Sequence, residues 1–289
     1  MSRNKNRTGM GEIPKPESSG PPPQVMTQGQ NENPFSFIVP TEFVELPSRG
    51  LFYPPNHPLH NQETIEVKQM TAKEEDLLTS RALLKKGLAL DRVISSIIVN
   101  KNINPNTLLV GDRNAILIAA RVSGYGNSYE TNVTCPNCST VNKHMFDLND
   151  LEIYHGDAVD SSEVTQNEDG TFTTILPRIK VEATFRLLSG NDEKNLLKQL
   201  DNARKKRQEE NSVTRQLRQI VVAVNGDTQQ QNINYVIDNM PSSDARHLRL
   251  MYKLTAPDID MTQDFTCSNC GHEQDMEVPL TADFFWPDR

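Results

Sequence analysis

Two Cys-x-x-Cys motifs contain all four cysteines of the chain, and they constrain its fold more than any other feature. The first is TCPNC at residues 134–138, and the second is TCSNC at residues 266–270. Each cysteine of the second motif lies 132 positions after its counterpart in the first. Because two such turns supply four thiolates to one ion, the sequence predicts one closed, tetrahedral Zn²⁺ site. The predicted ligands are Cys135, Cys138, Cys267 and Cys270.

The spacing of the two motifs is unusual for such a site. Zinc ribbons commonly separate their cysteine pairs by about 15–20 residues, whereas 128 residues separate the pairs here. Strand-like runs lie on both sides of each motif, so each motif is expected at the tip of a β-hairpin. The two hairpins must then meet in space although they are far apart in the sequence.

Other uses of paired cysteines fit the sequence less well. Two disulfide bonds require an oxidising compartment, and the amino terminus lacks the apolar segment of a secretion signal. A thioredoxin-like redox site uses one motif beside a βαβ pattern. Covalent haem attachment requires histidine directly after the second cysteine, whereas Gly271 precedes His272. A catalytic zinc keeps one coordination position open, so four cysteines favour a structural metal.

The charge balance argues against nucleic acid as a partner. Formal net charge is −8, from 30 basic and 38 acidic residues, and the one basic run covers residues 204–207. Nucleic-acid-binding domains neutralise phosphates with clustered Lys and Arg. We therefore expect no nucleic-acid partner, although the cysteine motifs alone would also fit a zinc-ribbon nucleic-acid-binding or transcription module. For the basic run, a solvated helical corner is favoured over a site for an acidic partner.

Composition and periodicity divide the chain into five segments. Residues 1–33 are rich in Pro, Gly, Gln and Asn, which predicts a disordered N-terminal arm; the alternative is an arm that orders on a neighbouring subunit. Residues 34–128 are expected to form strands, turns and helices, and residues 129–150 the first half of the ribbon. Residues 151–258 would contribute a strand and a helical insertion, and residues 259–289 the second ribbon half and an aromatic carboxyl terminus.

The expected fold class is α+β: a mostly helical body with short antiparallel strands and a split four-cysteine zinc ribbon formed by the two hairpins. Residues 71–74 match a capping box, and Asp112 is expected to cap a later helix, with Arg113 as a surface charge. Strict alternation between Ile179 and Leu187 predicts a half-buried strand. Helical spacing predicts helices at 71–86, 93–98, 112–123, 196–203, 213–224, 235–240 and 242–254.

The sequence predicts no active site. It contains no glycine-rich phosphate loop, nucleophile elbow or His-Glu-x-x-His helix. His144 and His272, which follow the two cysteine motifs, could support the metal or substitute as ligands, but four cysteines make them unnecessary. No apolar run approaches the ~18 residues of a membrane span. We therefore expect a protein that is not an enzyme, has no membrane span and is made in the cytosol.

The carboxyl terminus holds the only tryptophan of the chain within the run FFWP at residues 284–287. Tryptophan is enriched in the energetic centres of protein interfaces. The run therefore either packs on the ribbon or anchors a partner, and the sequence leaves both open.

Several segments in a fixed order resemble one known family. LPSRGLFYP at 46–54, MTAKEEDLL at 70–78, GDRNAIL at 111–117 and RVSGYG at 121–126 precede the first cysteine motif. FRLLSGNDE at 185–193, the second cysteine motif and FFWP follow it. Their order and spacing, from about residue 40 to the end, are similar to those of the baseplate hub and hub-assembly protein family of T-even-type contractile-tailed bacteriophages.

The resemblance implies a non-enzymatic protein that is part of the baseplate hub or an assembly chaperone for it. Its partners would be other phage baseplate and hub subunits, and the resemblance leaves its oligomeric state open. It would be found in the host cytoplasm during assembly or in the tail baseplate of the virion. A lytic or processing enzyme is a further alternative, but no pair of carboxylates lies in a context that favours general acid–base catalysis.

Overall fold

The computed structural model describes residues 39–85, 87–157, 163–206, 209, 211–279 and 282–285. Contacts divide the chain into Met1–Pro40 and Thr41–Arg289, and the fold described below is that of the second unit. The predicted N-terminal arm at 1–33 and the tryptophan, Trp286, lie outside the described residues, as does Arg207 of the basic run.

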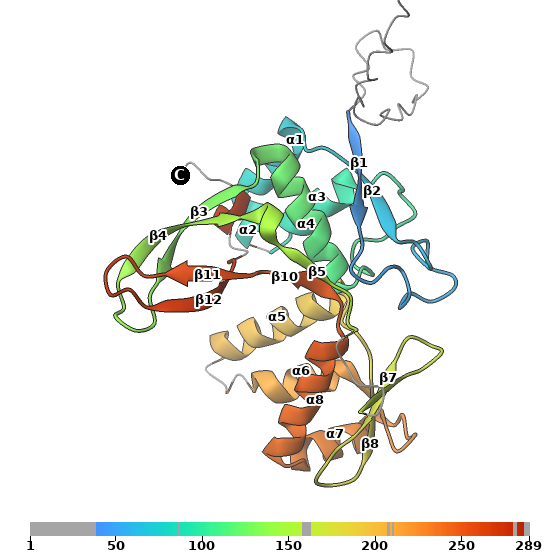
Figure 1. Ribbon diagram of the computed structural model, residues 1–289. Coiled ribbons are helices and arrows are strands. Elements are labelled where there is room, and N and C mark those ends of the chain that lie inside the picture. Colours follow the sequence, from blue (N-terminus) through green and yellow to red (C-terminus); the bar gives the residue numbers. More distant parts are fainter. Residues whose placement is uncertain are drawn as a thin grey trace, which may run out of the picture. The chain divides into compact units, whose positions relative to one another are not determined.

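The second unit begins with a β-hairpin beside four helices (Figure 1). Strand β1 (Thr41–Glu45) pairs antiparallel with β2 (Thr64–Lys68). The helices are α1 (Ala72–Thr79), α2 (Arg81–Lys85), α3 (Ala89–Ile97) and α4 (Val110–Tyr125). The predicted capping box is confirmed, because the backbone N–H of Thr71 donates to the carboxylate of Glu74 at 2.9 Å.

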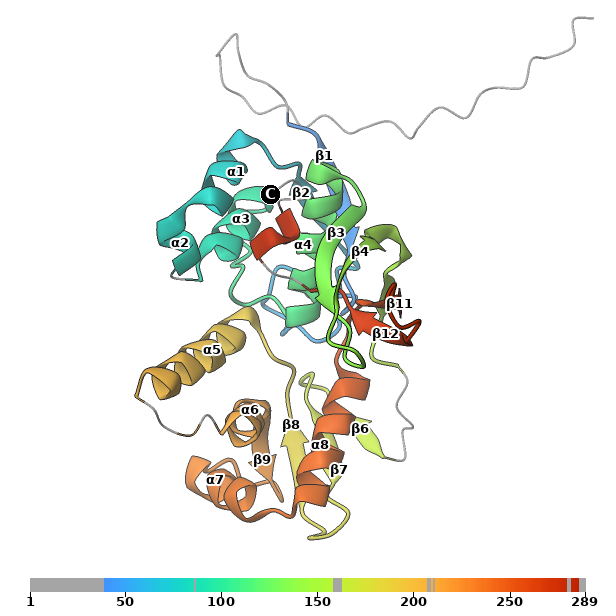
Figure 2. The same cartoon turned by 90° about the vertical axis from the view of Figure 1, so that its left-hand side faces the viewer.

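Two β-hairpins from distant parts of the sequence lie side by side (Figures 1 and 2). Strands β3 (Ser128–Thr134) and β4 (Val141–Asp147) form the first hairpin, and β11 (Thr262–Thr266) and β12 (Glu273–Glu277) form the second. A short ladder between β5 (Glu152–Tyr154) and β10 (Asp258–Asp260) joins the segments next to them. Two 3₁₀ turns, η1 (Leu148–Asp150) and η2 (Ala282–Phe285), complete this region.

The chain between β5 and β10 forms an insertion with its own sheet. Four antiparallel strands lie in the order β6 (Val164–Gln166), β7 (Phe172–Ile175), β8 (Glu182–Phe185) and β9 (Val221–Val224). Its helices are α5 (Gly190–Lys205), α6 (Ser212–Ile220), α7 (Gln230–Asn239) and α8 (Ser242–Thr255). The fold is therefore α+β, as predicted. None of the helices in the described part of the chain is both long and apolar enough to cross a membrane.

The helix predicted at 71–86 is interrupted at Ser80, between α1 and α2. Three further sequence-based predictions about these elements were wrong. The alternating run that begins at Ile179 is not one strand, because the backbone N–H of Ile179 donates to Asp244 and Lys180 has a positive φ of 56°, which makes a turn before β8. The helix predicted at 213–224 ends at Ile220, and Val221–Val224 pair with β8 instead. β-Branched valines favour this extended state once a partner strand is present.

The third error concerns the start of α4. Leu109, not Asp112, occupies the N-cap position, and Asp112 lies in the first helical turn with its side chain fully buried. Arg113 is also buried rather than a surface charge, and its guanidinium lies 3.0 Å from Asp91. Both side chains hold neighbouring segments onto α4.

At Gly111, helix α4 lies very close to the backbone of the segment that leads into β10. A Cβ on Gly111 would collide with the carbonyl oxygen of Pro257 and lie 2.7 Å from the Cα of Asp258, whereas a Cβ on Gly124 would meet only the flexible end of Met70. We expect Gly111→Ala to lower the free energy of unfolding by about 2 kcal/mol or more, because α4 and β10 must separate. Gly124→Ala should change it by no more than about 1 kcal/mol. Urea unfolding of both variants measures this, and equal effects would contradict the close approach.

Candidate metal centre

The two cysteine hairpins repeat each other in detail. Thr134 pairs with Val141 in the first hairpin, and Thr266 pairs with Glu273 in the second. Both partners of the second pair lie 132 positions after those of the first, and the same offset relates the neighbouring rungs of the two ladders. The offset seen in the sequence is therefore a structural repeat of strand, turn and strand.

The turns at the hairpin tips have the same backbone hydrogen bonds. The N–H of Cys135 donates to the carbonyl of Thr140, and the N–H of Cys267 donates to that of His272, each at 2.9 Å. The residue after each second cysteine has a left-handed backbone, with φ of 57° at Ser139 and 67° at Gly271. This conformation costs a non-glycine residue roughly 1–2 kcal/mol, so the first turn is held by its surroundings.

The four cysteine sulfurs converge on one point between the hairpins. All four Sγ atoms lie within 4.8 Å of one another. Sγ of Cys135 lies 3.8 Å from that of Cys270, and Sγ of Cys138 lies 3.7 Å from that of Cys267. A tetrahedron with Zn–S bonds of about 2.3 Å has sulfur–sulfur edges of about 3.8 Å, so these separations fit a four-coordinate metal. A disulfide would need about 2.05 Å, so the four thiols are free.

The side-chain amides of three asparagines, Asn137, Asn269 and Asn142, point at the sulfurs. Nδ2 of Asn137 lies 3.7 Å from Sγ of Cys270, and Nδ2 of Asn269 lies 3.7 Å from Sγ of Cys138. These two contacts cross between the hairpins and are related by the same offset of 132 positions. N–H groups that point at a sulfur stabilise the thiolate, which is the form that binds metal.

The pKa values of two thiols, Cys138 and Cys267, are lowered, which favours the thiolate form. Hydrogen bonds from the hydroxyl and the amide of Thr140 lower the pKa of Cys138 to about 5. The backbone N–H of Cys270 is the largest cause of the lowered pKa of Cys267. Burial raises the pKa of Cys135 to about 11. A bound metal cation would deprotonate this thiol outright, so its burial is compatible with a ligand role.

Asn142 joins the two hairpins directly beneath the sulfurs. Its side chain is buried, and its Oδ1 accepts hydrogen bonds from the backbone N–H of Ser268 at 2.9 Å and from its hydroxyl at 2.6 Å. Its Nδ2 donates to the carbonyl of Thr140 at 2.9 Å and lies 3.5 Å from Sγ of Cys267. Gln274 stands at the equivalent position of the second hairpin. Asn142 therefore places the second turn against the first.

Asn142→Asp is expected to weaken metal binding by the four cysteines about 10–100-fold, which is the usual effect of removing a group that orients a ligand. The carboxylate keeps the size of the amide but loses both N–H donors and adds negative charge beside the thiolates. Competition with a chromogenic chelator measures the affinity. Asn132→Asp, at an exposed position of β3, adds the same charge nearby and is the control. Equal affinities for the two variants would contradict the role of Asn142.

The two histidines beside the motifs have other contacts. The ring of His144 meets Phe146 and Phe265 edge-on, with centroids 4.6 and 5.3 Å apart, and so fills space between the hairpins. Nε2 of His272 lies 3.3 Å from Oε1 of Gln274. Among the described residues, the one cluster of possible metal ligands consists of the four cysteines.

The hairpins are also joined away from the sulfurs. The side-chain amide of Gln263 accepts from the backbone N–H of Asp147 at 3.2 Å and donates to its carbonyl at 2.5 Å, as a paired strand would. Phe284 and Phe285 are buried, and the ring of Phe284 packs edge-on against Tyr129 at 5.1 Å. Phe284 therefore packs on the first hairpin, whereas Trp286 of the same run lies outside the described residues.

Sequence reasoning missed the residues that support this arrangement. Arg121 is fully buried in α4 and donates to the backbone carbonyls of Phe284, Gly126 and Ser128. No short motif marks such an arginine, since its acceptors are backbone groups. The asparagines Asn137 and Asn269 were detectable, because the offset that relates the cysteines relates them too.

Comparison with protein families identifies the family of the chain. Residues 42–286 match the family described as T4 bacteriophage base plate protein. The match covers most of the chain, so the protein belongs to that family, and the predicted resemblance to a T4-type phage baseplate protein is confirmed. Comparison with curated proteins and with solved structures gave no match.

Proposed function

We propose that this baseplate protein helps to build the baseplate hub, as a hub subunit or as an assembly chaperone for it, through contacts with other baseplate and hub subunits. In this proposal one structural Zn²⁺, held by Cys135, Cys138, Cys267 and Cys270, fixes the shape that those contacts require. The protein works in the host cytoplasm during assembly, and as a subunit it would remain in the tail baseplate.

The observation that carries the proposal is the convergence of four sulfurs at tetrahedral spacing in a member of the baseplate family. The metal would join the hairpin that precedes the insertion from β5 to β10 in the sequence to the hairpin that follows it. Four cysteines leave no coordination position for a substrate, so the metal would supply rigidity rather than chemistry. Rigidity is useful to a docking protein, because a preorganised surface loses less entropy when it binds.

Two alternatives receive less support from the molecule. Asp112 and Arg113, the charged pair that invites a catalytic reading, are both buried and bonded to neighbouring segments. A zinc-ribbon nucleic-acid-binding module would present cations near its hairpins, whereas Asp147, Asp264 and Asp275 line a hollow between these hairpins. We therefore propose a protein that acts by binding other proteins, without catalysis.

Infection with a phage that lacks this gene tests the proposal. We expect few or no complete baseplates by electron microscopy, and restoration by the wild-type gene supplied on a plasmid. Mass spectrometry of purified tails then separates the two roles: a subunit is present at a fixed ratio to other hub proteins, and a chaperone is absent. Normal numbers of complete baseplates without the gene would reject the proposal.

A further inference from the structure

A small apolar cavity lies where the first helices meet the insertion. It has a volume of about 270 Å³ and lies between the start of α4, the segment after β8, α5 and the end of α8. An apolar cavity of about 150 Å³ already accepts a benzene ring, so this one has room for one large side chain. Its lining residues are Leu109, Val110, Gly111, Leu187, Leu188, Glu193, Leu196, Tyr252, Ala256, Pro257 and Asp258.

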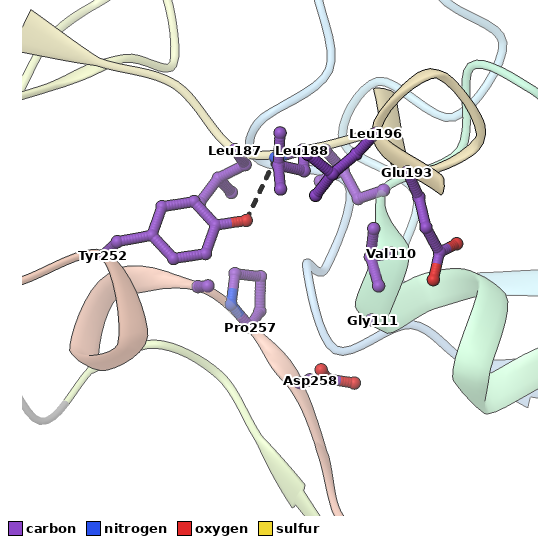
Figure 3. A pocket seen from close by; sticks show the side chains of 11 residues that line it. Val110, Gly111, Leu187, Leu188, Glu193, Leu196, Tyr252, Pro257 and Asp258 are labelled. Carbon is purple, nitrogen blue, oxygen red and sulfur yellow. Dashed lines mark hydrogen bonds between the residues drawn. The ribbon is translucent and has the colours of Figure 1, made fainter. Parts of the chain in front are cut away.

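Hydrogen bonds join Tyr252, Leu188 and Val110 in the wall of this cavity. The hydroxyl of Tyr252 accepts from the backbone N–H of Leu188 at 3.2 Å, which Figure 3 shows as a dashed line. The carbonyl of Leu188 accepts from the N–H of Val110 at 3.1 Å. Burial raises the pKa of Tyr252 to about 12. The leucines of this wall therefore offer an occupant apolar contact.

Two carboxylates accompany this apolar wall. Figure 3 shows the leucines on one side of the cavity and the carboxylates of Glu193 and Asp258 toward the other. The nearest cation on α5, Lys194, is paired with Asp91 at 2.6 Å. The charge beside the apolar wall is therefore negative.

Acidic side chains also line the hollow next to the cavity. A hollow of about 620 Å³ shares Tyr252, Ala256 and Asp258 with it, and its lining adds Asp260 and Glu277. This second hollow also contains Arg249 and Lys253. Burial is the largest cause of the raised pKa of Asp258, and the nearby carboxylates of Glu277 and Asp260 raise it further.

A third hollow, of about 530 Å³, follows between the two cysteine hairpins. It shares Asp260 and Thr262 with the second hollow, and no Lys or Arg is among its lining residues. The acids that line it are Asp147, Asp150, Asp260, Asp264 and Asp275. The apolar cavity, the second hollow and the third hollow thus adjoin one another through shared lining residues, and the third has the most acids in its lining. We call these three adjoining hollows the groove.

We propose that this groove binds a segment of a partner protein in which one large apolar side chain stands next to a run of Lys and Arg residues. The apolar side chain fills the cavity beside Leu196 and Tyr252, and the basic residues lie against the acids of the second and third hollows. This inference deepens the proposed function and rests on it, since it names the surface and the chemistry of the partner segment. Complementary charge would also speed the encounter and make it depend on salt.

Fluorescence anisotropy with three labelled 12-residue peptides tests the proposal on the full-length, zinc-loaded protein. The first peptide has one Trp beside four Arg, the second replaces Trp with Ala, and the third replaces Arg with Glu. We expect binding of the first peptide at least 10-fold tighter than of either other peptide, and at least 10-fold weaker at 300 mM than at 50 mM salt. Equal affinity for the first two peptides would overturn the proposal. So would the absence of detectable binding of the first peptide at about 1 mM.

Matched substitutions assign the binding to this groove. Leu196→Glu should weaken binding of the first peptide at least 10-fold. Leu197→Glu, at the next residue of α5, which is 56% exposed, should leave this binding unchanged. Asp260→Lys should weaken it at least 5-fold and reduce the salt dependence, whereas Asp201→Lys, an exposed position of α5 outside the groove, should not. Circular dichroism melts confirm that each variant is folded. Equal effects within either pair would overturn the proposal.

Sedimentation velocity distinguishes a second copy of the chain as the occupant. A dimer of the wild type that Leu196→Glu dissociates would assign the cavity to self-association and overturn the proposal. A monomer at the concentrations of the peptide assay supports it. Because the peptide assay uses no other baseplate protein, its failure leaves the infection experiment unaffected, and the two results can be separated.

Discussion

Removal of a metal held by the four cysteines should strongly destabilise the protein. Structural Zn²⁺ in small domains contributes an apparent 10–16 kcal/mol of folding free energy at about neutral pH. A covalent cross-link that closed the 128-residue loop between Cys138 and Cys267 would by itself contribute about 5 kcal/mol through chain entropy. We therefore expect chelation, or Cys267→Ser, to lower the free energy of unfolding by at least about 5 kcal/mol. For a chain of this length that corresponds to a melting temperature lower by about 10–20 °C.

Zinc content by mass spectrometry and a melting curve before and after chelation check this result together. One zinc per chain is expected in the wild type and a large loss in Cys267→Ser. His272→Ala is the control, because its ring pairs with Gln274 and is not among the four clustered ligands. It should keep its zinc and its melting temperature. A zinc-free protein with unchanged stability would show that the sulfurs meet for another reason.

The convergence of the four cysteines was predictable from the sequence because a closed four-cysteine metal site would fix residue type and spacing. Cysteine pairs at a constant offset require two turns of the same shape, and the structure has these turns with matching backbone hydrogen bonds. The capping box at Thr71 was predictable for a similar reason, since the bonded partners lie within one helical turn. Residue types and spacing within a short motif were sufficient for the cap and for each cysteine turn, whereas the meeting of the two motifs, 128 residues apart, followed from the need of one ion for four ligands.

The errors arose where the deciding partner is distant in the sequence. The apolar spacing of residues 213–224 fits one long helix, but Val221–Val224 gain hydrogen bonds from β8, which lies more than thirty residues earlier. Asp112 has the position expected of a helix cap, yet its acceptor oxygens are used by Ser48 and Tyr53, which lie 64 and 59 residues away. In both places tertiary contacts overrode a local preference.

Because Asp112 makes these distant contacts, its substitution is the second change that should strongly lower the free energy of unfolding. Its buried carboxylate accepts hydrogen bonds from the backbone N–H and the hydroxyl of Ser48, at 3.0 and 2.6 Å, and from the hydroxyl of Tyr53 at 2.6 Å. It thereby fixes the loop between β1 and β2 onto the first turn of α4. Asp112→Ala leaves these buried donors without an acceptor and should cost about 3–4 kcal/mol, measured by urea unfolding.

Tyr53→Phe and the pH dependence separate hydrogen bonding from packing. Tyr53→Phe keeps the ring and removes one donor to Asp112, so it should cost less, about 1–2 kcal/mol. Burial raises the pKa of Asp112 above its ordinary value of about 3.9. The stability contributed by its protonated form is therefore complete below that value and is lost as the pH rises through the raised pKa. The difference in unfolding free energy between wild type and Asp112→Ala should accordingly become smaller as the pH rises from 4. A difference that grows over this range would show that the folded protein favours the ionised carboxylate.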